Sequence, residues 1–534
     1  MELQILKISS RFAVLEWKNE SCYYTQQQYE IYVNGEWRGK GQTNVFGIYD
    51  LLPDTAYKAV LRYGREERTL EFCTQREAAC LNVLSFGAKP EGEESSAEAI
   101  NAAVACCPQG GTVYFPPGIY KTNTVFLKSG VRLYLEKGAV IKSLASRREL
   151  AVLPGDMRPQ AEGVGRAADE AKRERVNFGT WEGNPVDCFA AVITGIGVKD
   201  AEIAGEGEID GGGRDGDWWE DPVTKRGAWR PRTIFLNGCE DICIAGVTIG
   251  NSPSWTVHPY YCKKLAFYDV TIRNPAVSPN TDGLDPESCQ DVVIAGARIS
   301  VGDDCIAIKS GRKGMAKRWL CPSERIEIRN CLMERGHGGV VIGSEIACGV
   351  KEVLIKQCLM RETDRGLRIK TQRGRGNASV VSGIFFENVI MEEVKTAFSI
   401  NMYYYWGPDG HSEYVQSRKA LPVDERTPRV GDLHMRNVQC RGCQAAGVYF
   451  LGLPEQPVEL VEMEGVSIEF AESCRPDEPV MADGVGPVSG LGIYAENVRS
   501  LKLSDVCVSG YKGEPVQLHG VWEVKGDYFG KEQP

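Results

Sequence analysis

The sequence predicts a mainly β protein in which a right-handed parallel β-helix follows a small β-sandwich. Two observations support this fold class. One pattern of apolar residues returns along most of the chain at intervals of about one solenoid coil, and the first 76 residues read instead as short strands separated by turn residues. The expected domains are the sandwich at residues 1–76 and the solenoid at residues 80–534.

The N-terminal segment carries the signals of a sandwich. Tyr29, Ile31 and Val33 alternate with other residues in one predicted strand, and the pair Asn34-Gly35 follows directly, which is a strong hairpin signal. Five residues together resemble a fibronectin type III domain with its tyrosine corner: Trp17, Leu51, Pro53, Thr55 and Tyr57. We interpret this segment as a structural or docking module.

A repeated pattern predicts the solenoid. The pattern apolar-x-apolar-x-x-apolar-x-apolar describes two short strands joined by a tight bend, and its shortest steps are 23 and 27 residues. A single coil has no core, so each coil must bury its apolar side against its neighbours. A helix near Ser95, with Glu98 completing a capping box, is expected to cover the open N-terminal end. The nine copies of the pattern begin at Ile242, Leu265, Val292, Ile326, Val353, Ile384, Leu433, Val461 and Leu501.

Composition and charge narrow the classes of partner. The chain has 62 Lys and Arg against 72 Asp and Glu, a net charge of −10, whereas a nucleic-acid binder usually has a basic face. No apolar run reaches the roughly 18 residues that span a bilayer, so we expect neither a nucleic-acid nor a membrane partner. The 19 cysteines are scattered and the first residues do not resemble a secretion signal, so a reducing cytoplasm is the expected location.

A second column of residues, ahead of the first in each coil, contains the candidate site. Stacked coils lie about 4.8 Å apart, so three carboxylates, an imidazole, a guanidinium and an ammonium should converge on one short strip. The anchors of the column are Pro259, Pro286, Ile308, Ile342, Ile369 and Ile400. Four places before an anchor lie Trp255, Asp282, Asp304 and Gly338, five places before lie Ser254, Thr281, Asp303 and His337, and Arg368 and Lys370 flank Ile369.

Clustered carboxylates of this kind suit acid/base chemistry. Neighbouring like charges raise the pKa of at least one carboxyl group, which separates an acid from a base. Asp303 and Asp304 follow Gly302, so we expect a bend that presents both side chains, because a regular strand would send them to opposite faces. Any single Asp could instead belong to a ladder of solvated turns with a structural role. Such a ladder does not explain why an imidazole, a guanidinium and an ammonium group occur beside three carboxylates.

Four short motifs occur in order along this column: NTDG at 280–283, GDDC at 302–305, GHG at 336–338 and RIK at 368–370. They resemble the signature motifs of glycoside hydrolase family 28, the polygalacturonases, and the resemblance spans roughly residues 80–515. It implies a pectin-lyase-like β-helix. It also implies inverting hydrolysis of α-1,4-galacturonide bonds in galacturonate oligosaccharides, with no cofactor and no metal.

The resemblance implies a catalytic role for four residues. Asp303 is the expected general acid, and Asp282 and Asp304 are expected to hold and deprotonate the attacking water. His337 is expected to hydrogen-bond near Asp303 and to keep its protonation state suitable.

Five further residues are expected to bind substrate. Arg368 and Lys370 would pair with galacturonate carboxylates, Arg as a planar fork and Lys as a point charge. Asn280 belongs to the first motif. Trp255 and Tyr404 could offer platforms for sugar faces, with core or loop packing as the equal alternative.

Exo action is the expected mode of cleavage. Two long polar insertions, at residues 147–185 and 403–432, and the added N-terminal domain offer material to close one end of the groove. The alternatives are a rhamnogalacturonan or xylogalacturonan hydrolase of the same family, a calcium-dependent pectate-lyase-like β-helix, and a non-catalytic carbohydrate-binding solenoid. The sequence leaves a homo-oligomer open.

Overall fold

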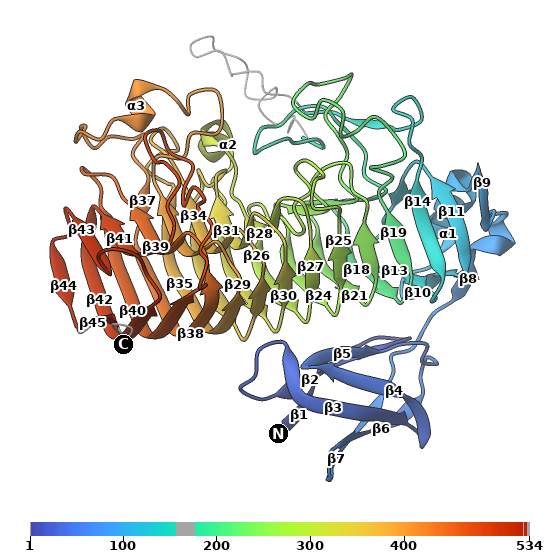
Figure 1. Ribbon diagram of the computed structural model, residues 1–534. Helices are drawn as coiled ribbons and strands as arrows, with labels where there is room; N and C mark the ends of the chain where they lie inside the picture. The colour runs from blue at the N-terminus through green and yellow to red at the C-terminus, as the bar shows by residue number, and fades with distance from the viewer. Residues whose placement is uncertain (1, 156–176, 527, 531–534) are drawn as a thin grey trace.

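The computed structural model describes residues 2–155, 177–526 and 528–530, and it shows a long solenoid with a small sandwich along one side (Figure 1). Within these ranges no helix combines the length and apolar character needed to cross a membrane. Helical segments are short: η1 (Val83–Phe86), α1 (Ala97–Cys106), α2 (Lys313–Arg318) and α3 (Glu413–Gln416).

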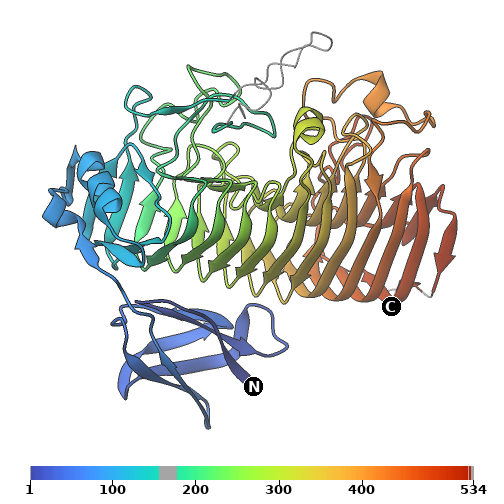
Figure 2. The ribbon, with the colours of Figure 1, turned by 180° about the vertical axis from the view of Figure 1, so that it is seen from behind.

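Helix α1 covers the N-terminal end of the solenoid, as expected (Figure 2). Ile100, Ala103 and Val104 form its buried face. The predicted capping box is wrong. The helix begins after Ser96, and the Ser96 hydroxyl accepts a hydrogen bond from the Lys89 N–H at 2.8 Å instead of capping the helix.

Two antiparallel sheets form the N-terminal sandwich. The hydroxyl of Tyr57 accepts a hydrogen bond from the backbone N–H of Leu52 at 2.7 Å, which is the contact expected of a tyrosine corner. The β-sandwich prediction is therefore confirmed, and kinship with fibronectin type III domains stays a prediction. One sheet contains β1 (Glu2–Ile8), β2 (Ala13–Lys18) and β5 (Val45–Ile48), and the other contains β3 (Tyr24–Val33), β4 (Glu36–Thr43), β6 (Ala56–Tyr63) and β7 (Glu66–Cys73).

The solenoid is built around one large parallel sheet that carries the repeated pattern. The first strands of the coils are β8 (Cys80–Asn82), β10 (Gly111–Phe115), β13 (Val131–Leu135), β18 (Lys199–Gly205), β21 (Glu240–Ala245), β24 (Lys263–Tyr268), β26 (Gln290–Ala295), β29 (Ser323–Arg329) and β32 (Val350–Lys356). The strands after the corner are β9 (Glu91–Ser95), β11 (Gly118–Thr122), β14 (Ala139–Ser143), β19 (Glu208–Asp210), β22 (Thr248–Gly250), β25 (Thr271–Arg273), β27 (Arg298–Ser300), β30 (Leu332–Glu334) and β33 (Leu359–Arg361). Later coils contribute β35 (Val380–Glu392), β37 (Arg429–Val430), β38 (Asp432–Cys443), β40 (Val458–Phe470), β42 (Val498–Ser509), β44 (Glu523–Lys525) and β45 (Tyr528–Gly530).

Every copy of the repeat turns its corner at a residue with positive φ. The fifth residue of each copy has φ between 51° and 77°. Gly, Asn and Asp adopt this left-handed conformation with the least strain, and all but one of the nine corner residues are of these types. The nine are Gly246, Asp269, Gly296, Asn330, Gln357, Asn388, Asn437, Gly465 and Asp505.

A second parallel sheet carries the candidate site. Isolated bridges from Val257 to Leu284 and from Leu284 to Ile306 join its two parts into one stack. The first part contains β12 (Val125–Phe126), β17 (Ile193–Ile196), β20 (Ile234–Asn237) and β23 (Val257–Tyr260). The second contains β28 (Asp304–Ile308), β31 (Gly338–Gly343), β34 (Arg365–Lys370), β36 (Thr396–Asn401), β39 (Ala446–Leu451), β41 (Leu491–Glu496) and β43 (Val516–His519).

The two insertions rise above the solenoid, and the sandwich lies on the other side (Figures 1 and 2). The first insertion contains β15 (Val152–Leu153), which pairs antiparallel with β16 (Cys188–Phe189) just after the insertion, and the second insertion contains α3. Residues 156–176 of the first insertion lie outside the described residues.

The sandwich docks on the outer face of the large sheet through apolar and charged contacts. Phe12 and Val14 of the sandwich pack in one buried cluster with Tyr134 and Ala204 of the solenoid. Glu16 forms a buried ion pair with Arg329, with Oε1 at 2.8 Å from Nε, and also accepts a hydrogen bond from Asn330. The expectation that this domain helps to close the groove is therefore wrong, because its docking face belongs to a different sheet from the site.

We expect the Glu16–Arg329 pair to hold the two domains together. Glu16→Ala removes the carboxylate that pairs with the buried Arg329 guanidinium. This loss should lower the free energy of unfolding, measured by urea titration, by about 3–5 kcal/mol. The exposed Glu67→Ala should change it by less than about 0.5 kcal/mol. Equal effects of the two substitutions would contradict the assigned importance of the pair.

Candidate active site

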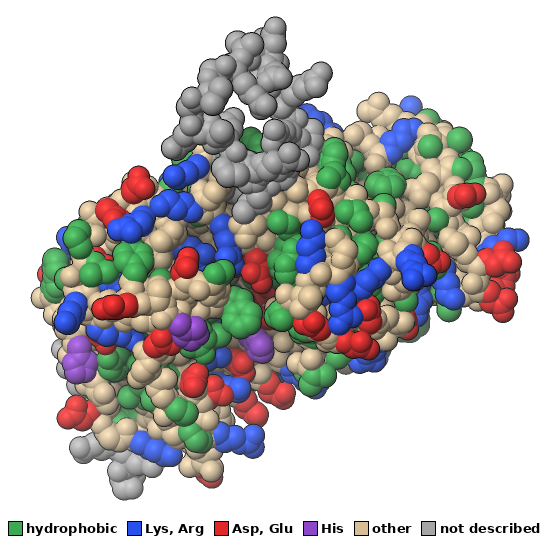
Figure 3. Space-filling model, turned by 90° about the horizontal axis from the view of Figure 1, so that it is seen from above, with side chains coloured by type: hydrophobic (Ala, Val, Ile, Leu, Met, Phe, Trp, Pro, Cys, Tyr) green, Lys and Arg blue, Asp and Glu red, His purple; other side chains and the backbone are tan. Residues whose placement is uncertain are grey.

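The predicted register of the second column is confirmed. Val257, Leu284, Ile306 and Val340 are neighbours in successive coils, which places Trp255, Asp282, Asp304 and Gly338 side by side two residues earlier. Ile342, Ile369 and Ile400 follow in the same register. We use the name site strip for Asp282, Asp303, Asp304, His337, Arg368 and Lys370. Seen from above, the face bearing the insertions is hollowed and presents charged side chains of both signs (Figure 3).

A bend at Gly302 presents both adjacent carboxylates, as expected. Asp304 opens β28, and its backbone N–H donates to Oδ1 of Asp303 at 3.0 Å. The Asp303 side chain is 21% exposed, whereas that of Asp304 is only 1% exposed. Nδ1 of the half-exposed His337 lies 3.3 Å from Oδ1 of Asp303, and this contact raises the pKa of His337. Asp303 is therefore the most accessible carboxylate of the strip.

Asp304 is held as a carboxylate by two cations from β34. Nζ of Lys370 lies 2.6 Å from its Oδ2, and Nη1 of Arg368 lies 3.4 Å from its Oδ1. Burial alone would raise the pKa of Asp304, but the two cations outweigh burial and hold it well below the ordinary value. Arg368 and Lys370 reach Asp304 across β31, where Gly338 has no side chain; a Cβ at Gly338 would lie only 2.4 Å from Cγ2 of Val341.

Asp282 has the opposite electrostatic environment. Burial and the neighbouring charge of Asp303 raise its pKa to about 7, although Lys309 opposes the shift. Nζ of Lys309 lies 3.5 Å from Asp282, from Asp285 and from Glu345. Neither Asp285 oxygen has a hydrogen-bond partner among the described residues, and burial also raises the pKa of Asp285 well above its ordinary value. Asp282 and Asp304 are neighbours in the strip, yet the pKa of Asp282 is raised and that of Asp304 is lowered.

Lys309 and Asp285 are site residues that the sequence analysis missed, although a signal for both was present. Lys309 follows its anchor Ile308 just as Lys370 follows Ile369, and Asp285 precedes its anchor Pro286 just as Arg368 precedes Ile369. The positions on either side of every anchor point away from the core, so reading these columns through all coils identifies them.

Trp255 and Tyr404 differ in what surrounds them. Trp255 is 5% exposed, stacks on Trp181 with ring centroids 6.3 Å apart, and has Nζ of Lys309 at 4.3 Å from its ring, which favours the packing alternative. Tyr404 is buried to the same degree, at 6% exposed, and it lies beside the strip, with Nζ of Lys370 at 5.4 Å from its ring.

Asn280 and His258 are both engaged with protein groups. Asn280 adopts φ of 54° and accepts a hydrogen bond from Nη2 of Arg230 at 2.6 Å. His258, which the sequence suggested to be structural, is buried and lies 2.9 Å from Oε2 of Glu287.

The three carboxylates of the strip are close enough to bind a metal ion, but protein cations already contact two of them. Single oxygens of Asp282, Asp303 and Asp304 lie within 4.8 Å of one another, close enough to share an ion. Asp304 already contacts Arg368 and Lys370, and Asp282 contacts Lys309. A divalent cation would add positive charge beside three cations, so the arrangement suits acid/base chemistry better than metal binding.

Comparison with known proteins gives a consistent result. The model described as "Glycosyl hydrolases family 28" matches residues 173–478, and the model described as "Rhamnogalacturonase A/epimerase, pectate lyase-like" matches residues 80–153. A "Probable polygalacturonase" of Vitis vinifera is 30% identical over 80% of this chain and 82% of its own length. An "Endo-polygalacturonase" of Pectobacterium parmentieri is 28% identical over 67% of this chain and 81% of its own.

Solved structures share the fold. A family 28 exopolygalacturonase of Yersinia enterocolitica aligns over 98% of both chains with a TM-score of 0.71 and 18% identity. An exopolygalacturonase of Thermotoga maritima aligns over 84% of this chain and 93% of its own, with a TM-score of 0.63 and 23% identity.

The pairing of Asp304 with Lys370 predicts a pH-dependent stability. At pH 7, Lys370→Met should lower the free energy of unfolding by about 3–5 kcal/mol, because a buried carboxylate loses its nearest cation. The depressed pKa of Asp304 stabilises the parent protein above the ordinary carboxyl pKa and ceases to do so as the pH falls. The difference in free energy of unfolding between the parent protein and Lys370→Met, measured by urea unfolding, should therefore become smaller as the pH falls to 4 and below. The exposed Lys502→Met serves as the control, and a deficit independent of pH would contradict the pairing.

Proposed function

This chain belongs to glycosyl hydrolases family 28, and we propose that it hydrolyses α-1,4-galacturonide bonds of oligogalacturonates by an inverting acid/base mechanism. The observation that carries the proposal is the site strip. The accessible Asp303 lies beside two buried carboxyl groups, Asp282 with a raised pKa and Asp304 with a lowered pKa. The polygalacturonases among its relatives support this choice of substrate.

Asp303 is the proposed general acid. It is the most exposed carboxyl group of the strip, and His337 contacts it from the solvent side. Protonated Asp303 would give its proton to the glycosidic oxygen as the bond breaks. His337, whose pKa is raised by Asp303, would serve as the hydrogen-bonding partner that keeps this carboxyl group oriented.

Asp282 and Asp304 are the proposed water-activating pair. Single oxygens of the three carboxylates lie within 4.8 Å of one another, a shorter separation than the roughly 6.5–9.5 Å between carboxyl groups that is typical of inverting enzymes. Neither buried carboxylate is presented as a nucleophile, since Asp282 is 3% exposed and Asp304 is bound by two cations. A water held against this pair is therefore the attacking group, and inversion at the anomeric carbon follows. Proton NMR of the anomer released first tests this assignment.

Arg368 and Lys370 are proposed to bind a substrate carboxylate while they keep their contacts with Asp304. Arg has five N–H donors and Lys has three, and the contacts to Asp304 use only part of them. Asn280 and Tyr404, which flank the strip, are the further proposed contacts.

The acid assignment predicts the behaviour of Asp303→Asn. Turnover should fall by at least about a thousandfold, because proton donation is lost, whereas the affinity for trigalacturonate should change by less than about threefold. Reducing-end release measures turnover, and calorimetry measures binding. His337→Gln is the matched comparison and should retain more activity. Turnover of Asp303→Asn near that of the parent would reject the assignment.

Exo action is proposed on the basis of how the first insertion meets the segment before α2. Nη2 of Arg312, in the segment before α2, lies 3.1 Å from Oε2 of Glu182 in the first insertion, and the Arg312 N–H donates to the Gly183 carbonyl at 3.3 Å. These contacts link two walls above the strip, which favours a groove that is closed at one end.

The mode of cleavage predicts a product profile. Digestion of pentagalacturonate should release a single small product size in the first turnovers, together with the complementary shortened chain. Separation of the products by size provides the measurement. A rapid fall in the viscosity of polygalacturonate, with mixed mid-chain fragments, would instead show endo action.

A cytoplasmic location is also proposed. All 19 cysteines are free thiols, and many of them are buried in the solenoid core. A reducing compartment suits such a set. Cell fractionation with an antibody to this chain is the direct test.

A further inference from the structure

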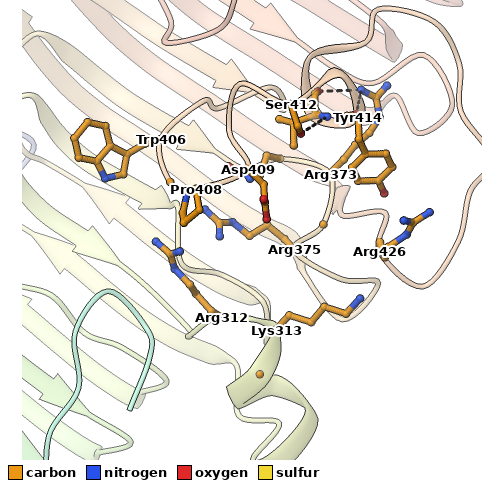
Figure 4. A pocket seen from close by; sticks show the side chains of 15 residues that line it. Arg312, Lys313, Arg373, Arg375, Trp406, Pro408, Asp409, Ser412, Tyr414 and Arg426 are labelled. Carbon is orange, nitrogen blue, oxygen red and sulfur yellow. Dashed lines mark hydrogen bonds between the residues drawn. The ribbon is translucent and has the colours of Figure 1, made fainter. Parts of the chain in front are cut away.

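A cavity of about 560 Å³ opens beside the site strip (Figure 4). The residues that line it have no role in the proposed acid/base mechanism. This volume lies within the range of small-ligand sites, roughly 300–1,000 Å³. The cavity is lined by residues 312–314 around the start of α2, by residues 372–375 after β34, and by residues 406–415 and Arg426 of the second insertion.

The lining of the cavity is strongly cationic. Five basic side chains line it, against the single acidic side chain of Asp409. In the part of the chain that the structure describes, four of these cations have a carboxylate partner within 4 Å. The pairs are Arg312 with Glu182, Lys313 with Glu425, Arg373 with Glu455, and Arg426 with Asp424.

Arg375 is the exception. Its side chain is only 7% exposed, and among the described residues its Nε and Nη2 have no hydrogen-bond partner. Burial of the guanidinium lowers the pKa of Arg375 to about 10, with only partial compensation from Glu345. Because a buried charge without a hydrogen-bonded partner is costly, a bound anion would relieve this cost. Figure 4 shows Arg375 and Arg312 extending into the same part of the cavity.

Glu345 connects the cavity to the site strip. Its Oε1 lies 3.6 Å from Nη2 of Arg312, and its Oε2 lies 3.5 Å from Nζ of Lys309. Lys309 in turn contacts Asp282. A continuous chain of charged contacts through Glu345 and Lys309 therefore joins the cavity lining to Asp282.

We infer that this cavity binds the carboxylate of a uronate residue beyond the one that occupies the site strip, with Arg375 as the principal contact. The inference rests on the proposed function. The planar guanidinium fork of Arg375 matches a carboxylate, and the 45% exposed Trp406 at the rim offers an apolar face for the sugar ring. The cavity would therefore select free uronates over their methyl esters.

The test compares two ligands in the inactive Asp303→Asn background. Trigalacturonate and its fully methyl-esterified form are titrated by calorimetry. Arg375→Gln should weaken binding of the free acid about tenfold or more and binding of the ester less than about twofold, because a charge-assisted hydrogen bond is lost only from the acid. Arg441→Gln, which removes the same charge from the outer face of β38, should change neither.

Two further variants keep the inference falsifiable. Arg375→Lys retains the charge and should recover part of the affinity for the free acid. Trp406→Ala, at an exposed position, should weaken both ligands alike. An unchanged ratio of acid to ester affinity in Arg375→Gln, or unchanged binding of both ligands in Trp406→Ala, would overturn the inference.

The proposed function can fail separately from this inference. If the parent protein releases no reducing ends from trigalacturonate, the proposed function itself is wrong. If release is normal and the ratio of acid to ester affinity does not respond to Arg375→Gln, only the assignment of the cavity is wrong.

Discussion

Parallel hydrogen bonding between successive coils is the constraint on which the whole site depends. It fixes adjacent coils about 4.8 Å apart, so residues more than 80 positions apart in sequence, from Asp282 to Lys370, share one short strip. A slip of one residue in any coil would turn its outward side chains into the core. The buried anchors, such as Ile342 and Ile369, therefore determine the geometry of the site as well as the stability of the solenoid.

Close stacking of carboxylates is tolerated because cations are stacked in the same register. Lys370 and Arg368 keep Asp304 ionised, whereas Asp282 shares Lys309 with Asp285 and Glu345 and has a raised pKa. Neighbouring groups of one chemical type thus acquire different proton affinities, which is what an acid/base mechanism requires. The stacked charges continue into the cavity, where Nε and Nη2 of Arg375 have no hydrogen-bond partner among the described residues.

The solenoid separates its tasks between faces. The sandwich docks on the large sheet, whose corners repeat left-handed residues such as Gly246 and Asn330, and it leaves the site face free. The insertions stand over the second sheet, where Arg312 links the first insertion to the segment before α2. The insertions are therefore the added elements that stand over the site, whereas the docked domain contacts the outer face of the large sheet.

The sequence by itself determined the fold class, the coil register and the site strip, because each follows from local periodicity. Apolar alternation specifies which residues are buried, and a regular stack converts equal places in the repeat into neighbours in space. The same register contains Lys309 and Asp285, whose contact with each other and with the strip is a feature of the tertiary structure. Only the tertiary structure decided which face the sandwich covers, that Trp255 is buried, and that Arg312, Arg375 and Trp406 meet around one cavity. These features arise where loops of irregular length cross between coils, and no periodic spacing encodes where such segments meet.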